Sequence, residues 1–185
     1  WYERARKKNE RRYIMILTKK QIKSIHNEKV TFIKNFTKPN KIYDFNYLSI
    51  IAEEYVGDQN GVQIYSRGDS FETVWGVKHI HNVDYDLFLY YDFFKKLFNF
   101  TDDSRSGVDL FFSFSSCVGP PHADEEVVFL LGLYGKTIYK DFKHKTDYTI
   151  NAGDLLVIPG GIRHKAIACS PRIIASIGFF GDRNK

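Results

Sequence analysis

Apolar residues recur at helical spacing in three stretches of the first half of the chain. Stretches 17–26, 43–55 and 85–98 place them three and four positions apart, which predicts three helices. The third stretch is apolar on most of its circumference, so we expect that helix to lie under a sheet. Two shorter runs, 30–36 and 62–66, have the composition of strands. The first half is therefore predicted to be mixed, with helices predominating.

After residue 107 the pattern changes to short β-rich segments. Gly, Pro, Asn or Asp separates one segment from the next, and closely spaced strands with such turns are typical of a sandwich or barrel. The segments are 108–116, 127–133, 137–142, 148–150, 155–158, 165–168 and 172–180. The predicted fold is α+β, mainly β, with an N-terminal half of helices and strands packed on a C-terminal β-barrel.

Composition indicates a globular domain with a bulky interior. The chain has 185 residues, of which 43% are hydrophobic and 16% aromatic, enough for one domain with one large core. Its two cysteines, Cys117 and Cys169, form no CxxC pair and cannot build a disulfide framework, which favours a reducing compartment. No apolar run is long enough for a membrane span and no signal peptide is evident. We therefore expect a soluble, cytoplasmic protein without membrane contact.

The net charge of +5 is concentrated at the N-terminus. Residues 1–12 hold six basic and two acidic side chains, so the rest of the chain is close to neutral. We divide the chain into a basic arm, 1–14, and one domain, 15–185, whose barrel spans about 108–180. Nucleic-acid contact is expected, if at all, through the arm at 1–12. A solvated helix end is the alternative reading of that arm.

The segment GPPHAD at 119–124 places two potential metal ligands one residue apart. In an extended chain residues i and i+2 point to the same face, so the His122 imidazole and the Asp124 carboxylate aim at one place. The tripeptide alone is weak support for a site, since such patterns arise by chance. A solvated turn remains the alternative.

A second segment, NAGDLLVIPGGIRHKA at 151–166, supplies a third ligand. A turn, a buried strand and a Pro-Gly-Gly bend precede His164, which fits the second cupin motif, G-x5-P-x-G-x2-H. His122, Asp124 and His164 would together occupy one face of a metal ion and leave the opposite positions open. This 2-His-1-carboxylate arrangement is typical of non-haem Fe(II) sites.

The sequence offers no fourth protein ligand and no second metal site of comparable strength. The His79-Ile80-His81 pair has no partner ligand at suitable spacing downstream. The usual first cupin motif carries a glutamate where this chain has Val128 and Phe129, so a fourth protein ligand is missing. A polar rim with an ordinary core histidine remains the non-metal alternative.

The order of these parts resembles the jumonji-C (JmjC)/cupin-like branch of Fe(II)- and 2-oxoglutarate-dependent oxygenases. The resemblance covers the chain from about residue 30 to its end and implies a double-stranded β-helix, the jelly-roll or cupin barrel. It also implies Fe(II) on His122, Asp124 and His164, 2-oxoglutarate as the cosubstrate that chelates the iron, and O2. The implied activity is that of a dioxygenase, through hydroxylation or oxidative demethylation.

The resemblance also suggests how the far carboxylate of 2-oxoglutarate is held. Many JmjC hydroxylases use a lysine at the position of Thr137, whereas Lys136 is one residue off and expected on the other face. Another branch uses an arginine that opens the last barrel strand, and Arg172 lies eight residues past His164. We expect Arg172 to anchor the carboxylate with help from Thr137, with Lys136 in reserve. A solvated strand end is the alternative for Arg172.

The substrate is the least constrained expectation. The resemblance favours a protein or peptide side chain, with a small-molecule 2-oxoglutarate oxygenase as the next alternative. A metal-dependent cupin isomerase, a dioxygenase without cosubstrate and a non-catalytic cupin that binds a small ligand are the further alternatives. The oligomeric state is left open.

Overall fold

The computed structural model describes residues 17–39, 42–47, 49–50, 62–65, 77–81, 85–101 and 103–180. The expected arm at 1–14 lies outside these residues, and so do residues 48 and 51–55 of the helix expected at 43–55, whereas residues 45–47 and 49–50 are helical. The elements are α2 (Lys19–His26), β1 (Thr31–Ile33), β2 (Val62–Tyr65), β3 (Val77–His81), α4 (Tyr85–Phe98), β4 (Gly107–Ser113), β5 (Cys117–Val118), β6 (Val127–Tyr134), β7 (Lys136–Asp141), β8 (Thr146–Asn151), β9 (Leu155–Ile158), β10 (His164–Ala168) and β11 (Arg172–Phe179).

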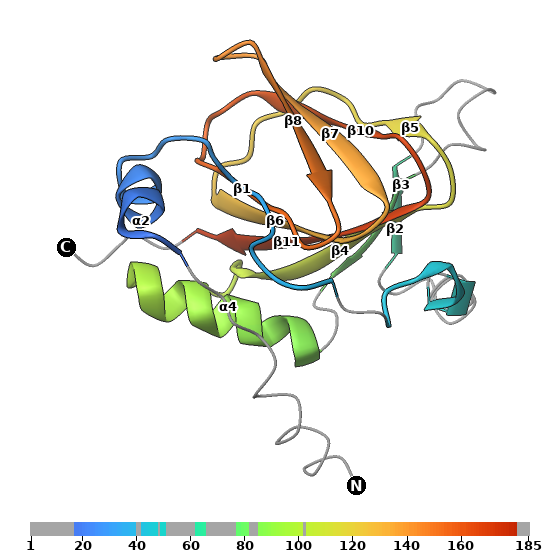
Figure 1. Cartoon of the computed structure of the whole chain (residues 1–185), viewed down its shortest axis with the longest axis horizontal. Helices are drawn as coiled ribbons and strands as arrows, with labels where there is room; N and C mark the ends of the chain where they lie inside the picture. The colour runs from blue at the N-terminus through green and yellow to red at the C-terminus, as the bar shows by residue number, and fades with distance from the viewer. Residues whose placement is uncertain are drawn as a thin grey trace, which may run out of the picture.

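Two antiparallel sheets face each other across the barrel interior (Figure 1). The larger sheet has the order β1-β9-β6-β11-β4-β3-β2, and the smaller has the order β5-β10-β7-β8. From β4 to β11 the chain passes back and forth between the sheets, with β4, β6, β9 and β11 in the larger one. This is the topology of a double-stranded β-helix, so the predicted jelly-roll fold is confirmed.

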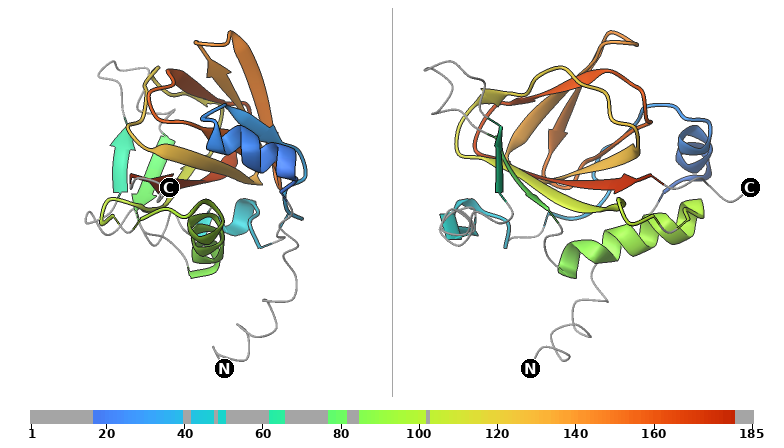
Figure 2. Two further views of the ribbon diagram at one scale, coloured as in Figure 1. Left: turned by 90° about the vertical axis from the view of Figure 1, so that its left-hand side faces the viewer. Right: turned by 180° about the vertical axis from the view of Figure 1, so that it is seen from behind.

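Helix α4 covers the outer face of the larger sheet, as its apolar circumference predicted (Figure 2). The Phe94 ring on α4 stacks on the Phe129 ring of β6 with the centroids 4.2 Å apart. Val108, Leu110 and Phe112 of β4 belong to the same buried cluster. Within the described residues, no helix is long and apolar enough to cross a membrane.

The N-terminal half contributes strands as well as helices. Strand β1 pairs with β9, with Phe32 opposite Leu156, and β3 pairs with β4 in the same larger sheet. The first half therefore extends the larger sheet at both edges. Strand β1 is shorter than the strand expected at 30–36, and β3 was not expected at all.

The strand expected at 108–116 is interrupted. Strand β4 ends at Ser113, Phe114 is exposed, and the chain crosses to the smaller sheet, where the two residues of β5 pair with β10. The apolar pattern did not reveal this crossing, because β5 is defined by its partner strand and not by its own composition.

Alternation along β4 and β11 sends a second set of side chains into the barrel. Val108 and Leu110 pack toward α4, so Ser113, Asp109 and Phe111 lie on the face that looks at the smaller sheet. Arg172 is the Cα partner of Ser113 and shares that face. The interior therefore holds polar residues beside an apolar cluster of its own, formed by Val128, Leu130, Tyr139, Ile150, Leu156, Ile158, Ile162 and Ile174.

Candidate metal centre

A local backbone bridge joins the two histidines of the site. The His122 N–H donates to the His164 carbonyl at 2.9 Å, and the His164 N–H donates to the His122 carbonyl at 2.8 Å. Residues that exchange both bonds lie directly opposite each other in an antiparallel pair, with side chains on one face. The two imidazole centroids are accordingly only 4.5 Å apart.

The bend at Pro159-Gly160-Gly161 holds the segment that carries Asp124. The Gly161 N–H donates to the Asp124 carbonyl at 2.8 Å. Gly161 has φ +76°, and a Cβ on Gly160 would lie 2.3 Å from the Glu125 carbonyl oxygen. Glycine at 160 therefore permits a close backbone approach, and glycine at 161 permits the left-handed turn.

Backbone carbonyls fix which ring nitrogen of each histidine carries the proton. His122 Nδ1 lies 2.9 Å from the Pro120 carbonyl oxygen, and His164 Nδ1 lies 3.0 Å from the Ile162 carbonyl oxygen. A carbonyl oxygen only accepts, so each Nδ1 donates, and in the neutral ring Nε2 then presents a lone pair. Burial lowers the pKa of the His164 imidazole, which favours that neutral form.

The Nε2 atoms of the two histidines and the Asp124 carboxylate converge on one point at distances longer than a typical hydrogen bond. Nε2 of His122 lies 3.6 Å from Asp124 Oδ1, and Nε2 of His164 lies 3.5 Å from Asp124 Oδ2. The ligand atoms all lie within 4.8 Å of one another. Two ligands about 2.1 Å from one ion are about 3.0 Å apart at the 90° angle of an octahedral facial site and about 3.4 Å apart at a tetrahedral angle. The side chains therefore fit a divalent cation, which would offset the repulsion among them.

Exposure across the triad is graded from the interior to solvent. The side chain of His164 is 3% exposed, that of Asp124 is 24% exposed and that of His122 is 49% exposed. A cation held by these three would have protein on one side and free coordination positions on the other. The geometry thus suits an ion that binds a further ligand.

Arg172 lies inside the barrel, only 2% exposed. Its Nη1 donates to Thr137 Oγ1 at 3.2 Å, and Thr137 is itself buried. Among the described residues, Arg172 makes no ion pair. Its Nε and the Ser113 Oγ are buried and have no hydrogen-bond partner in the described part of the chain. A buried cation without an anion is costly, so this cluster is suited to bind one.

Tyr139 links the arginine to the triad, a role that the sequence did not suggest. Its ring centroid lies 6.1 Å from that of His164. Burial raises the pKa of its phenol, while the charge of Arg172 and a hydrogen bond with it act in the opposite direction. The alternation of β7 was the available signal, because Tyr139 is two residues after Thr137 and shares its face.

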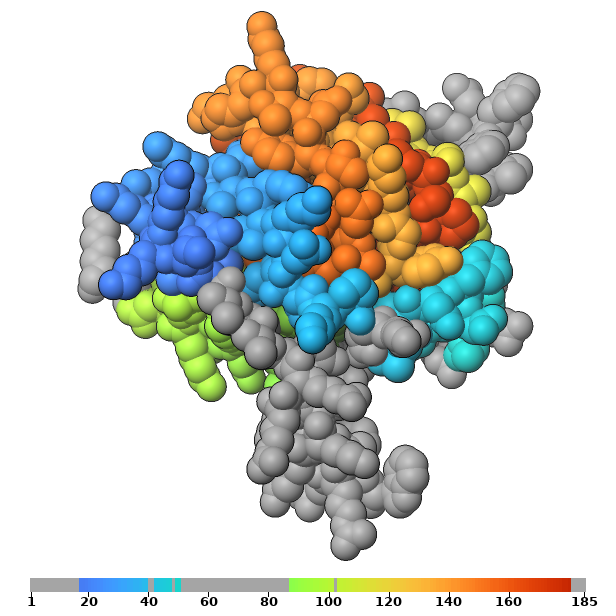
Figure 3. All heavy atoms as spheres, viewed as in Figure 1, coloured from blue at the N-terminus to red at the C-terminus, as the bar shows by residue number. Residues whose placement is uncertain are grey.

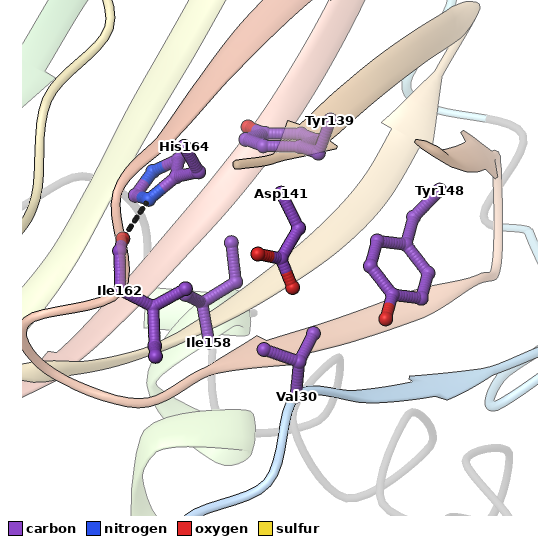
Figure 4. A pocket seen from close by; sticks show the side chains of 7 residues that line it. All are labelled: Val30, Tyr139, Asp141, Tyr148, Ile158, Ile162 and His164. Carbon is purple, nitrogen blue, oxygen red and sulfur yellow. Dashed lines mark hydrogen bonds between the residues drawn. The ribbon is translucent and has the colours of Figure 1, made fainter. Parts of the chain in front are cut away.

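A narrow recess adjoins His164 on the side of β7 and β8 (Figure 4), and it has no room for a water molecule. Its wall includes His164 and Tyr139, and Asp141 projects between Ile158 and Tyr148. The remaining lining residues are Val30 and Ile162. The recess is thus lined by apolar side chains together with the polar groups of His164, Asp141 and the two tyrosines.

Lys136 does not join this interior. It opens β7 with an exposed side chain, and its backbone N–H donates to Ser170 Oγ at 3.2 Å. The structure therefore brings Thr137 to Arg172 and places Lys136 at the surface. His79 and His81 lie in β3 (Val77–His81), which pairs with β4 in the larger sheet, whereas the triad is built on the bridge between His122 and His164.

The strand order of β4–β11, with His164 at the entry of β10 and His122 and Asp124 between β5 and β6, is that of a double-stranded β-helix. The solved structures of YcfD, a ribosomal oxygenase from Escherichia coli, have this fold. One is 16% identical to the chain and aligns with a TM-score of 0.66 over 94% of the chain and 54% of YcfD. The resemblance inferred from the sequence is thereby confirmed at the level of the fold.

Two further YcfD structures contain ligands. The complex with cobalt and succinic acid is 16% identical, with a TM-score of 0.66 over 93% of the chain and 54% of YcfD. The complex with cobalt and 2-oxoglutarate is 17% identical, with a TM-score of 0.63 over the same shares. The chain thus spans about half the length of YcfD. No protein-family model and no curated protein sequence matches it.

Proposed function

We propose that this protein is an Fe(II)- and 2-oxoglutarate-dependent oxygenase that hydroxylates a protein or peptide side chain. One observation carries the proposal: a single barrel interior holds both a convergent His-Asp-His triad and a buried guanidinium that makes no ion pair with a described carboxylate. The triad suits a cation and the guanidinium suits an anion. 2-Oxoglutarate needs both, since its 2-oxo acid end binds the metal and its far carboxylate binds a positive group.

The likeness to YcfD supports the same reading. YcfD is described as a ribosomal oxygenase and has been solved with cobalt and 2-oxoglutarate. At 16–17% identity this similarity shows a shared fold and does not show a shared activity. The proposed activity is therefore supported by the side chains of this chain.

His122, Asp124 and His164 would hold the iron. The carbonyls of Pro120 and Ile162 keep both Nδ1 atoms protonated and so keep both Nε2 atoms directed at the ion. The bound iron would supply the oxygen chemistry, in which 2-oxoglutarate and O2 yield succinate and CO2 while one oxygen atom enters a substrate C–H bond.

Arg172 would hold the far carboxylate of 2-oxoglutarate. Its guanidinium is fixed by Thr137, and its free Nε and the free hydroxyl of Ser113 are buried donors that a carboxylate would satisfy. Tyr139 lies between this cluster and His164, where its phenol can donate to the same ligand. The cluster therefore orients the cosubstrate and shields it from water.

A polypeptide substrate is the finer part of the proposal. The ribosomal oxygenase likeness favours it, and the exposed edge of the triad at His122 leaves room for a side chain presented from a large partner. A small metabolite is the alternative that the same site would also admit.

The test is the oxygen-dependent conversion of 2-oxoglutarate to succinate by the iron-loaded protein, first alone and then with cell lysate. We expect turnover that Asp124→Ala abolishes, and a gain of one oxygen atom on a protein by mass spectrometry. Oxygen gain on metabolites alone would contradict the polypeptide reading. Absence of both turnover and 2-oxoglutarate binding would contradict the oxygenase itself.

A further inference from the structure

The hairpin of β7 and β8 projects beyond the rest of the barrel (Figures 1 and 3). Its turn carries the sequence KDFKHKT, residues 140–146, and β10 lies beside it. We define the basic hairpin surface as Lys140, Phe142, Lys143, His144, Lys145, Arg163 and Lys165. The surface stands next to the triad, because Asp141 at the base of the turn is the Cα partner of His164.

The positive charge of this surface is largely uncompensated. The two carboxylates of the hairpin itself are already engaged: Asp141 by the His144 ring nitrogen at 2.6 Å, and Asp147 by Lys140 Nζ at 3.0 Å. Lys143, Lys145 and Arg163 are exposed, and they form no ion pair within the part of the chain that the structure describes. Three free cations therefore face solvent together.

An exposed aromatic ring lies among these cations. Phe142 is 44% exposed, its N–H donates to the Arg163 carbonyl at 3.0 Å, and the Arg163 guanidinium carbon lies 5.9 Å from its ring centroid. Exposure of the Phe142 ring forgoes the favourable free energy that burying its apolar surface would provide. Its ring offers a flat apolar face for a planar partner.

The turn is held in shape before any partner arrives. Asp141 Oδ1 accepts the N–H groups of Lys143 and His144 at 2.9 and 3.0 Å. Lys145 adopts φ +53°, a strained value for a lysine. A surface ordered in advance loses less conformational entropy when it binds.

We propose that the basic hairpin surface binds a single-stranded polynucleotide. Lysines spread along a hairpin neutralise successive phosphates, and an exposed ring beside them stacks on a base. An acidic peptide would use the cations but would have no need of the ring. The bound strand would lie beside the open edge of the triad. This binding is separate from the proposed oxygenase activity and is expected whether or not that activity is found.

The experiment is fluorescence anisotropy of the full chain with labelled oligo(U) and oligo(dT) of about 12 nucleotides, a length within the usual site sizes. Removing the three free cations together (Lys143→Ala, Lys145→Ala, Arg163→Ala) should weaken binding by about tenfold or more. It should also make the salt slope shallower by about two, since each phosphate contact contributes about 0.7 on a single strand. Phe142→Ala should weaken binding by about fivefold or more.

The matched control removes three exposed lysines from α2 (Lys19→Ala, Lys20→Ala, Lys23→Ala), which deletes the same charge at another place. Equal losses in the two triple variants would overturn the proposal, because binding would then follow net charge, including that of residues 1–12. Tighter binding of a labelled poly-glutamate peptide, with Phe142→Ala unchanged, would assign the surface to an acidic peptide instead. Circular dichroism confirms that each variant is folded. The oligo(U) and oligo(dT) arms separate RNA from DNA.

Discussion

At the scale of single residues, the site is defined by groups whose usual partners are missing. The Nε2 atoms of His122 and His164 lie 3.6 and 3.5 Å from the Asp124 carboxylate oxygens, longer than a typical hydrogen bond. Deeper in the barrel, the guanidinium of Arg172 is buried with an unpartnered Nε. Folded proteins rarely retain such groups without a ligand to satisfy them. Both features therefore favour binding over structural roles.

Substituting His164 tests the cation site. His164→Ala leaves one imidazole and one carboxylate, so the dissociation constant for Mn(II), measured by equilibrium dialysis, should rise by about 100-fold or more. His26→Ala removes an exposed imidazole at the end of α2 and should leave Mn(II) affinity unchanged. Undiminished affinity in His164→Ala would remove this residue from the site.

Substituting Arg172 tests the anion site, because the affinity for 2-oxoglutarate should fall while the free energy of unfolding should rise. Arg172→Met should weaken 2-oxoglutarate binding by about tenfold or more, because a charge-assisted bond is worth about 1.5–3 kcal/mol. It should also raise the free energy of unfolding of the ligand-free protein by about 1 kcal/mol, because an unpaired buried charge is replaced by a methionine of similar volume.

Calorimetry of 2-oxoglutarate binding and urea unfolding give the two numbers for Arg172→Met. Lys136→Met is the control, since that side chain is already exposed and should change neither quantity. A loss of stability in Arg172→Met with no loss of affinity would show that the arginine is structural.

At the scale of elements, two turns set the geometry around the triad. The 159–161 bend packs against the Glu125 backbone, and its hydrogen bond to the Asp124 carbonyl holds that segment beside β10. The β7–β8 turn is organised by Asp141, whose carboxylate accepts two backbone N–H groups and the His144 ring. Each turn depends on a residue outside the ligand set.

The first turn is tested by adding one methyl group. In Gly160→Ala the new Cβ would lie 2.3 Å from a backbone oxygen, so the bend must shift and Mn(II) affinity should fall by about tenfold. Gly161→Ala is the matched control: its Cβ meets nothing within 4 Å, but φ is +76°. It should cost about 1 kcal/mol of stability with metal affinity retained.

The second turn is tested by pH. Burial raises the pKa of the Asp141 carboxyl, but its hydrogen bonds with His144 outweigh that effect, and the net pKa is lowered from 3.8. A lowered carboxyl pKa stabilises the native state above the unfolded pKa, about 3.9, and this stabilisation is lost as pH falls through the native pKa.

Asp141→Asn should therefore reduce the free energy of unfolding by about 1 kcal/mol at pH 7, and the difference should shrink below about pH 4. Urea unfolding of both proteins across this range provides the measurement. Asp147→Asn, at a half-exposed pair with Lys140, should change little at any pH. A difference for Asp141→Asn that stays constant with pH would contradict the role of its charge.

The sequence predicted most strands of the barrel, because their apolar runs are bounded by turn residues. It did not predict β3 or β5, whose pairing depends on partners far along the chain. The three ligand candidates were recognisable since two motifs of fixed spacing carry them. The roles of Ser113 and Tyr139 were not, because only the register of β4 with β11 and the alternation of β7 bring them to Arg172 and His164.

At the scale of the whole molecule, the barrel interior holds the His-Asp-His triad at one end of β10 and the Arg172 guanidinium near the other end. The triad lies where β10 begins, opposite Asp141 at the end of β7. Thr137, which contacts Arg172, pairs with Ala168 at the other end of β10. Tyr139 lies between these levels, opposite Ala166.

The most direct test of this account is calorimetric titration of 2-oxoglutarate into the anaerobic protein, with and without Mn(II) as the stand-in for iron. We expect one binding event per chain that requires Mn(II), that His164→Ala abolishes and that Arg172→Met weakens by about tenfold or more. Binding that is equally tight without the metal, or no binding with the metal present, would contradict this account.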